Sequence, residues 1–142
     1  SKITSIDYYL DTPELTNCNY AFQATKQLQK IKGLNTSNVT TVANMFNGSE
    51  IETIEEPLDF SKVTTTTNSF YCNGLKNILF KAETIKVSIS FTSPVLSAES
   101  IQSIIDGLAT VTTAQTLTLG KAIVLTDEQK ATINAKGWTL AQ

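Results

Sequence analysis

Apolar residues recur along the first half of the chain at a fixed interval. Phe22, Phe46 and Phe70 follow one another at steps of 24 residues. The same step relates Leu15, Val39 and Val63, and the stretches between the phenylalanines carry aliphatic residues at similar offsets: Leu28, Ile31, Ile51, Ile54, Leu75 and Ile78. The pattern predicts a repeated unit with one short strand around its isoleucine and one helical turn around its phenylalanine.

Polar residues separate these two parts of each unit. Asn35-Thr36-Ser37-Asn38 and Asn47-Gly48-Ser49 are typical of turns, since Asn and Gly tolerate left-handed backbone angles. A single unit leaves its apolar face open until a neighbour stacks on it. The interval also falls within the roughly 20–29 residues of leucine-rich repeats. We therefore predict an α/β fold, a leucine-rich-repeat solenoid of short parallel strands and helical turns.

Two segments carry a recognisable motif. Ser37-Asn38-Val39-Thr40 followed by Asn44-Met45-Phe46-Asn47-Gly48 resembles the core of BspA-type leucine-rich repeats. Ser61-Lys62-Val63-Thr64 with Asn68-Ser69-Phe70-Tyr71-Cys72 resembles a second copy, preceded by a matching Leu58-Asp59-Phe60-Ser61. Thr65-Thr66-Thr67 departs from the usual Met-containing stretch. The resemblance covers about residues 15–80 and implies a right-handed β/α solenoid, no catalytic residues, and adhesion or recognition by a bacterial surface or phage-tail protein.

The second half has longer elements. Alternation over Lys86–Phe91 and Thr116–Gly120 predicts two strands, and Trp138–Leu140 predicts a third. Ser97 is the expected N-cap of a helix with apolar residues at Ile101, Ile104, Ile105 and Leu108. Thr126 and Gln129 form a capping box for a second helix, which should end near Lys136 with Gly137 after it. This half also resembles C-terminal units of bacterial and phage repeat proteins.

These patterns predict one domain over residues 1–142. Residues 15–80 hold the BspA-like repeats, and residues 81–142 hold strand–helix units that close the C-terminal end. The chain starts at Ser1 and carries no targeting signal, so we expect a fragment of a longer protein.

Composition narrows the function. The formal net charge is −2 and no basic run is present, so nucleic acid is not an expected partner. No apolar stretch is long enough to insert into a membrane. The acidic residues between Glu50 and Asp59 lack the spacing of a calcium loop, and we interpret them as a solvated rim.

Candidate catalytic chemistry is missing as well. The sequence has no histidine, which removes the usual general base and the commonest metal ligand. Cys18 and Cys72 lack metal-ligand spacing, and buried free thiols are favoured over a disulfide because the two fall at different offsets of the repeat. We predict that the protein is not an enzyme and uses no cofactor or metal.

A ligand would be expected on the outward residues of the stacked strands. Alternation about the buried isoleucines predicts a ligand face with Lys30, Lys32, Thr53, Glu55, Asn77 and Leu79, continued by Ser88, Ser90, Thr116, Thr118 and Thr139. A neutral, hydroxyl-rich strip suits a protein or glycan receptor better than a nucleic acid. The predicted function is therefore recognition or adhesion at a cell surface, outside the cell, or on a virion.

Two alternatives stay open beside recognition. The chain could instead be a structural spacer or assembly module of a larger surface or virion protein. An uncapped sheet edge at Ile3–Leu10 would also allow self-association, because an unpaired strand edge can accept another strand.

Overall fold

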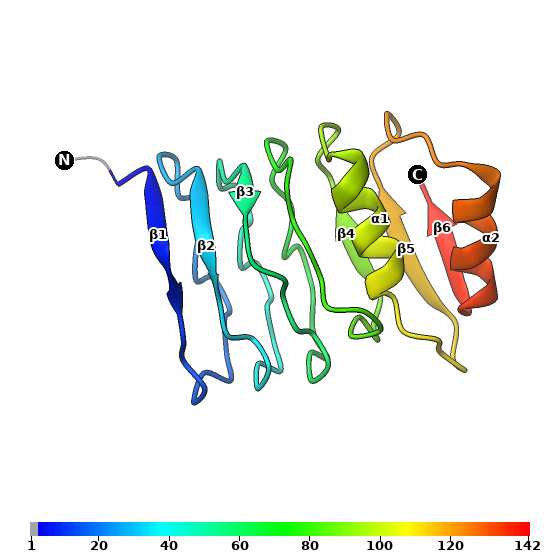
Figure 1. Ribbon diagram of the computed structural model, residues 1–142, viewed down its shortest axis with the longest axis horizontal. Helices are drawn as coiled ribbons and strands as arrows, with labels where there is room; N and C mark the ends of the chain where they lie inside the picture. The colour runs from blue at the N-terminus through cyan, green and yellow to red at the C-terminus, as the bar shows by residue number, and fades with distance from the viewer. Residues whose placement is uncertain (1–2) are drawn as a thin grey trace.

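The computed structural model describes residues 3–142, and its elements lie side by side along the long axis of the molecule (Figure 1). The described residues form six strands and two helices. In chain order these are β1 (Ser5–Leu10), β2 (Lys30–Leu34), β3 (Thr53–Ile54), β4 (Ile89–Phe91), α1 (Ala98–Gly107), β5 (Gln115–Leu119), α2 (Asp127–Ala135) and β6 (Trp138–Ala141).

The strands make two separate parallel sheets. One has the order β1-β2-β3 and the other the order β4-β5-β6. Ile31 pairs with Ile6 and Ile54 in the first sheet, and Leu117 pairs with Ile89 and Leu140 in the second. A register shift between Ile6 and Tyr9 gives β1 a bulge.

Neighbouring segments extend each sheet into a longer row. In the first row, Asn77 bridges to Thr53 of β3, and the amide of Ile78 donates to Ser100 Oγ of α1 at 2.9 Å. The first row is therefore β1, β2, β3, residues 76–80, α1 and α2. Bridges also link Asn17, Thr41 and Thr65, and Phe70 to Phe91 of β4. The second row is residues 17–23, 41–47 and 65–71, then β4, β5 and β6.

The predicted leucine-rich-repeat solenoid, with one strand and one helical turn in every unit, is wrong. The strands form two sheets instead of one continuous sheet, and both helices lie after residue 97. The strands change rows because β4 pairs with the Phe70 segment, whereas α1 occupies the place beside residues 76–80. An α/β fold remains consistent with these elements.

The apolar residues of the repeating pattern fill the space between the two rows. Leu28, Ile31, Ile51, Ile54, Leu75 and Ile78 are all buried, and they belong to one hydrophobic cluster. Phe46 is fully buried and stacks on Phe22 at 5.1 Å and on Phe70 at 5.8 Å between ring centroids. Phe70 stacks in turn on Phe91 at 5.0 Å. The interval of 24 residues thus corresponds to a ladder of packed side chains.

The segments predicted as helical turns are tight turns instead. Tyr20, Asn44 and Asn68 occupy equivalent places, and their φ angles are 61°, 57° and 52°. A left-handed residue interrupts both a helix and a strand, and Asn adopts this conformation more readily than most residues. These positions explain why the second row has no regular element before β4.

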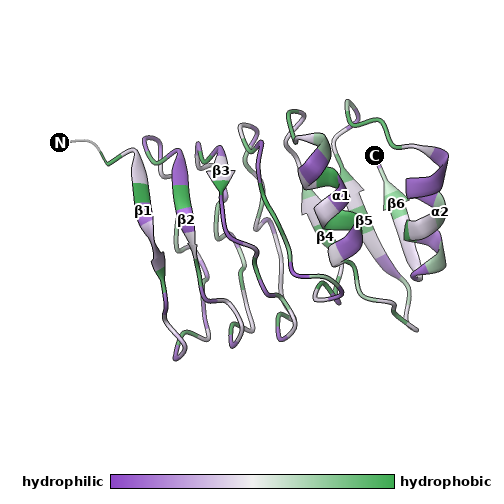
Figure 2. Cartoon of the chain, viewed as in Figure 1, coloured by the Kyte–Doolittle hydropathy of each residue, from purple (hydrophilic) through white to green (hydrophobic). Residues whose placement is uncertain are grey.

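The second half has the predicted alternation of strands and helices. Ser97 caps α1 by accepting from the amide of Ser100, and Thr126 forms the capping box of α2 with Gln129. Gly137 follows α2 with a φ of 91°, as predicted. Hydrophobic and hydrophilic residues both occur along each helix (Figure 2), and the buried residues of α1 include Ile104 and Ile105.

One lysine joins the end of α1 to the end of α2. Lys136 Nζ donates to the carbonyls of Ile105 at 3.1 Å and Leu108 at 2.8 Å, where α1 ends. A cation there satisfies free carbonyls and is favoured by the helix dipole. Glu83 Oε1 lies 3.2 Å from the same Nζ, and this contact, followed by the amide of Thr110, lowers the pKa of Glu83.

Candidate functional site

The predicted ligand face is divided between the two rows. Six of its residues lie on the first row: Lys30, Lys32, Thr53, Glu55, Asn77 and Leu79. Its other residues, Ser88, Ser90, Thr116, Thr118 and Thr139, lie on the second row. The structure therefore presents two surfaces with different chemistry, and binding by either surface remains a prediction.

The first-row surface is charged, and its charges pair with one another. Lys30 Nζ lies 2.6 Å from Glu55 Oε1, and Lys32 Nζ lies 3.6 Å from Glu55 Oε2 and 3.5 Å from Glu56 Oε1. Hydrogen bonding to Glu55 raises the pKa of Lys30, and the same contact lowers the pKa of Glu55. Because these side chains are partly exposed and mutually neutralised, the surface has little net field for a charged ligand.

The second-row surface contains an uncharged groove of about 290 Å³. It lies where β4 and β5 meet the segment before Phe70. Its lining consists of Thr66, Thr67, Asn68, Ser88, Ile89, Ser90, Thr116 and Thr118. Seven of these eight residues carry a hydroxyl or amide, and none carries a charge.

Hydrogen bonds at one end hold the groove in shape. Ser88 Oγ donates to Gln115 Oε1 at 2.9 Å and accepts from the amide of Thr116 at 2.9 Å. Thr66 Oγ1 donates to the carbonyl of Ser88 at 2.5 Å. These contacts tie the segment before Phe70 to β4 and β4 to β5, so the groove is preformed.

Four other hydroxyls remain available to a ligand. The hydroxyls of Thr67, Ser90, Thr116 and Thr118 form no side-chain hydrogen bond with any residue in the range 3–142. Neighbouring parallel strands lie about 4.8 Å apart, and alternate residues along one strand lie about 6.6 Å apart. Ser90, Thr116 and Thr118 therefore offer hydroxyls at fixed intervals, each able to donate and accept.

The sequence identified only half of this groove. Thr116, Thr118, Ser88 and Ser90 were expected on the ligand face, but Thr66, Thr67 and Asn68 were not. In the repeat motif, Thr65-Thr66-Thr67 is only a departure from the Met-containing stretch. Their excess of hydroxyls was the available signal, although their position beside β4 depends on the pairing of Phe70 with Phe91.

Neither cysteine offers a reactive nucleophile. Cys18 and Cys72 are free and buried, as the sequence favoured. Burial raises the pKa of Cys18 to about 11 and that of Cys72 to about 12. Both thiols are therefore protonated near neutral pH, and the thiolate that attacks or binds metal is scarce.

Residues 3–142 hold neither a cluster of metal ligands nor a membrane-spanning helix. No group of three or more acidic, Cys or His side chains there is placed to hold a metal ion. In the same range neither helix has the length and apolar character needed to cross a membrane.

Comparison of the chain with protein-family models, with curated proteins and with solved structures found no match.

Proposed function

We propose that the protein is a non-catalytic recognition or adhesion module that binds an uncharged ligand, a protein segment or a glycan, in the second-row groove. The observation that carries the proposal is the uncharged, preformed lining with four available hydroxyls. Hydroxyls and amides of this kind recognise neutral polar ligands through direct hydrogen bonds.

The motif resemblance of residues 37–48 and 61–72 also supports a location for this module. It favours the surface of a bacterial cell or a phage tail, where recognition of a receptor is the expected role. The pairing of Lys30, Lys32 and Glu55 on the first row supports the choice of the groove, because that surface presents few unpaired charges.

A binding screen with matched variants tests the proposal. The folded protein is applied to a panel of neutral glycans, to mucin and matrix proteins, and to intact bacterial cells. Thr118→Arg and Ser90→Arg place a bulky cation in the groove, and Thr53→Arg makes the same kind of change on the first row. We expect each groove variant to lose roughly tenfold or more in affinity, while Thr53→Arg binds as the wild type does.

Two results would contradict the groove assignment. The first is equal loss in Thr53→Arg and Thr118→Arg, and the second is binding that survives both groove variants. Circular dichroism and thermal melts of each variant separate lost binding from lost folding.

A second function, assembly within a larger structure, is favoured by a different observation. The two ends of the molecule carry unpaired strand edges, at β1 and at β6. Such edges pair with other strands unless they are covered.

A further inference from the structure

The N-terminal end of the second row presents a line of carbonyl groups without donors. Within the second row, amides of one segment donate to carbonyls of the next: Cys18 to Thr41, Tyr20 to Ala43 and Phe22 to Met45, at 2.8–3.0 Å. The following segment repeats this, with Val42, Asn44 and Phe46 donating to Thr65, Thr67 and Ser69. All of these bonds point from the earlier segment to the later one.

The first segment of the row therefore lacks the donors that the later segments have. The carbonyls equivalent to those of Thr41, Ala43 and Met45 belong to Asn17, Asn19 and Ala21, and no group in residues 3–142 donates to them. The amides of residues 18–23 are all engaged, three in the next segment and three in local turns. Residues 18–23 of this edge thus offer acceptors and no free amides.

The other end of the same row offers donors. β6 is the last strand of its sheet, and the amide of Gln115 in β5 donates to the carbonyl of Gly137 at 3.5 Å. In a parallel strand, the main-chain N–H and C=O groups of successive residues point alternately to the strands on its two sides. The amides of Trp138, Leu140 and Gln142 are therefore directed to the free edge of β6.

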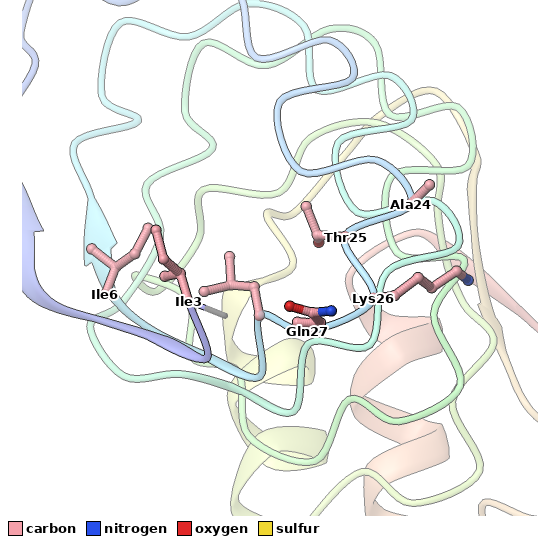
Figure 3. A pocket seen from close by; sticks show the side chains of 7 residues that line it. Ile3, Ile6, Ala24, Thr25, Lys26 and Gln27 are labelled. Atoms are coloured by element: carbon pink, nitrogen blue, oxygen red, sulfur yellow. The ribbon is translucent and has the colours of Figure 1, made fainter. Parts of the chain in front are cut away.

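Each end of the molecule also has a pocket. At the N-terminal end, a pocket of about 410 Å³ opens between Ile3 and Ile6 and residues 24–28 (Figure 3). At the C-terminal end, α2 packs against β6. A pocket of about 300 Å³ lies there between α2 and β6, lined by Ile133, Trp138 and Leu140 among others.

We propose that copies of this chain associate head to tail, with β6 of one copy adding to residues 17–23 of the next. In this junction β1 of the next copy lies beyond α2 and continues the first row, while residues 17–23 of the next copy lie beyond β6 and continue the second row. The amides of Trp138, Leu140 and Gln142 then donate to the carbonyls of Asn17, Asn19 and Ala21, as each second-row segment donates to the next within one copy. Asp7 of β1 and Lys130 at the C-terminal pocket add opposite charges to this junction.

The directions of these groups argue against a symmetric dimer through the N-terminal edges of the second row. A two-fold axis would set carbonyls against carbonyls, because the amides of residues 18–23 are already engaged. β1 is also a poor strand for self-pairing, since its bulge and the exposed Asp7 disturb the edge. A head-to-tail contact does not close on itself, so it predicts open chains of copies.

Sedimentation velocity over a range of concentrations tests this with two blocked variants. Ala21→Arg obstructs the carbonyl edge, Asn134→Arg obstructs the C-terminal pocket, and Thr112→Arg in an exposed loop is the matched control. We expect the mass of the wild type and of the control to rise with concentration beyond that of a dimer. Each blocked variant should associate roughly tenfold or more weakly and remain monomeric.

Mixing the two blocked variants gives the decisive result. Each has one intact end, so an equimolar mixture should form a dimer and stop there. A wild type that stays monomeric at every concentration overturns the proposal and leaves these ends for another protein or a further segment. A wild type that stops at a dimer, with Asn134→Arg still dimerising alone, overturns it in favour of a symmetric contact. These outcomes are independent of ligand binding in the groove, which lies between the two ends.

Discussion

Ser69 and Ser100 are both buried hydroxyls with opposite roles. Ser69 Oγ finds no hydrogen-bond partner within residues 3–142. Ser100 Oγ accepts from the amide of Ile78 at 2.9 Å and from Ser97 Oγ at 2.9 Å, so it joins α1 to the preceding segment. An unpaired buried hydroxyl costs stability, whereas a bonded one satisfies groups that would otherwise be buried alone.

We therefore predict opposite effects of the same substitution. Ser69→Ala should leave the free energy of unfolding unchanged or raise it by about 1 kcal/mol. Ser100→Ala should lower it by about 1–3 kcal/mol, because the amide of Ile78 loses its acceptor. Urea unfolding of both variants measures the difference, and an equal loss in the two would show that Ser69 has a partner in solution.

Residues near chain turns were predictable from the sequence because their partners are local. The caps at Ser97 and Thr126 and the glycine at position 137 all depend on groups within four residues. The free state of Cys18 and Cys72 followed from their different places in the repeat.

At the scale of elements, the tight turns of the second row contain a further left-handed pair. Ala24 has a φ of 56° and Gly48, one unit later, has a φ of 69°. An L-residue in this conformation costs about 1–2 kcal/mol, and Gly avoids the cost while losing more entropy on folding. The first of these two turns is therefore strained and the second is not.

Ala24→Gly should accordingly raise the free energy of unfolding by about 0.5–1 kcal/mol. Ala43→Gly, at a position of the same row without a positive φ, should lower it by a similar amount. Chemical denaturation at low protein concentration measures both changes. Equal destabilisation by the two glycines would mean that the turn at Ala24 relaxes in solution.

The arrangement of elements was less predictable than their existence. The alternation at 86–91 and 115–119 indicated strands, but pattern alone does not say which segment a strand pairs with. Phe91 pairs with Phe70, 21 residues earlier in sequence, instead of extending the sheet of β2 and β3. This pairing of β4 depends on the packing of α1 beside residues 76–80. As a result, Thr116 and Thr118 lie on a different row from Lys30 and Lys32.

At the scale of the whole molecule, contacts run from each unit to its neighbours. The hydrophobic cluster is continuous from Cys18 to Trp138, yet the end units are incomplete. Phe22 is only partly buried, whereas Phe46 and Phe70 are fully buried. Local opening should therefore begin at both ends and be rarest in the middle.

Hydrogen exchange measures this gradient. We expect the slowest exchange at the amides of Phe46 and Ile54, which donate to Ser69 and Asn77 at 2.9 Å. The amides of Phe22 and Asn35 at one end, and those of β6 at the other, should exchange faster. Uniform protection along the chain would show that the molecule opens as one cooperative body.

The bonds between second-row segments have a mechanical consequence. They join neighbouring segments along the long axis of the molecule, across which the chain winds back and forth (Figure 1). A pulling force applied to the chain ends would break the hydrogen bonds between one pair of neighbouring segments at a time. The end units would therefore unfold first. Each released unit of 24 residues would lengthen the tether by up to about 80 Å. Under tension, the protein would extend in steps while its inner units stay folded.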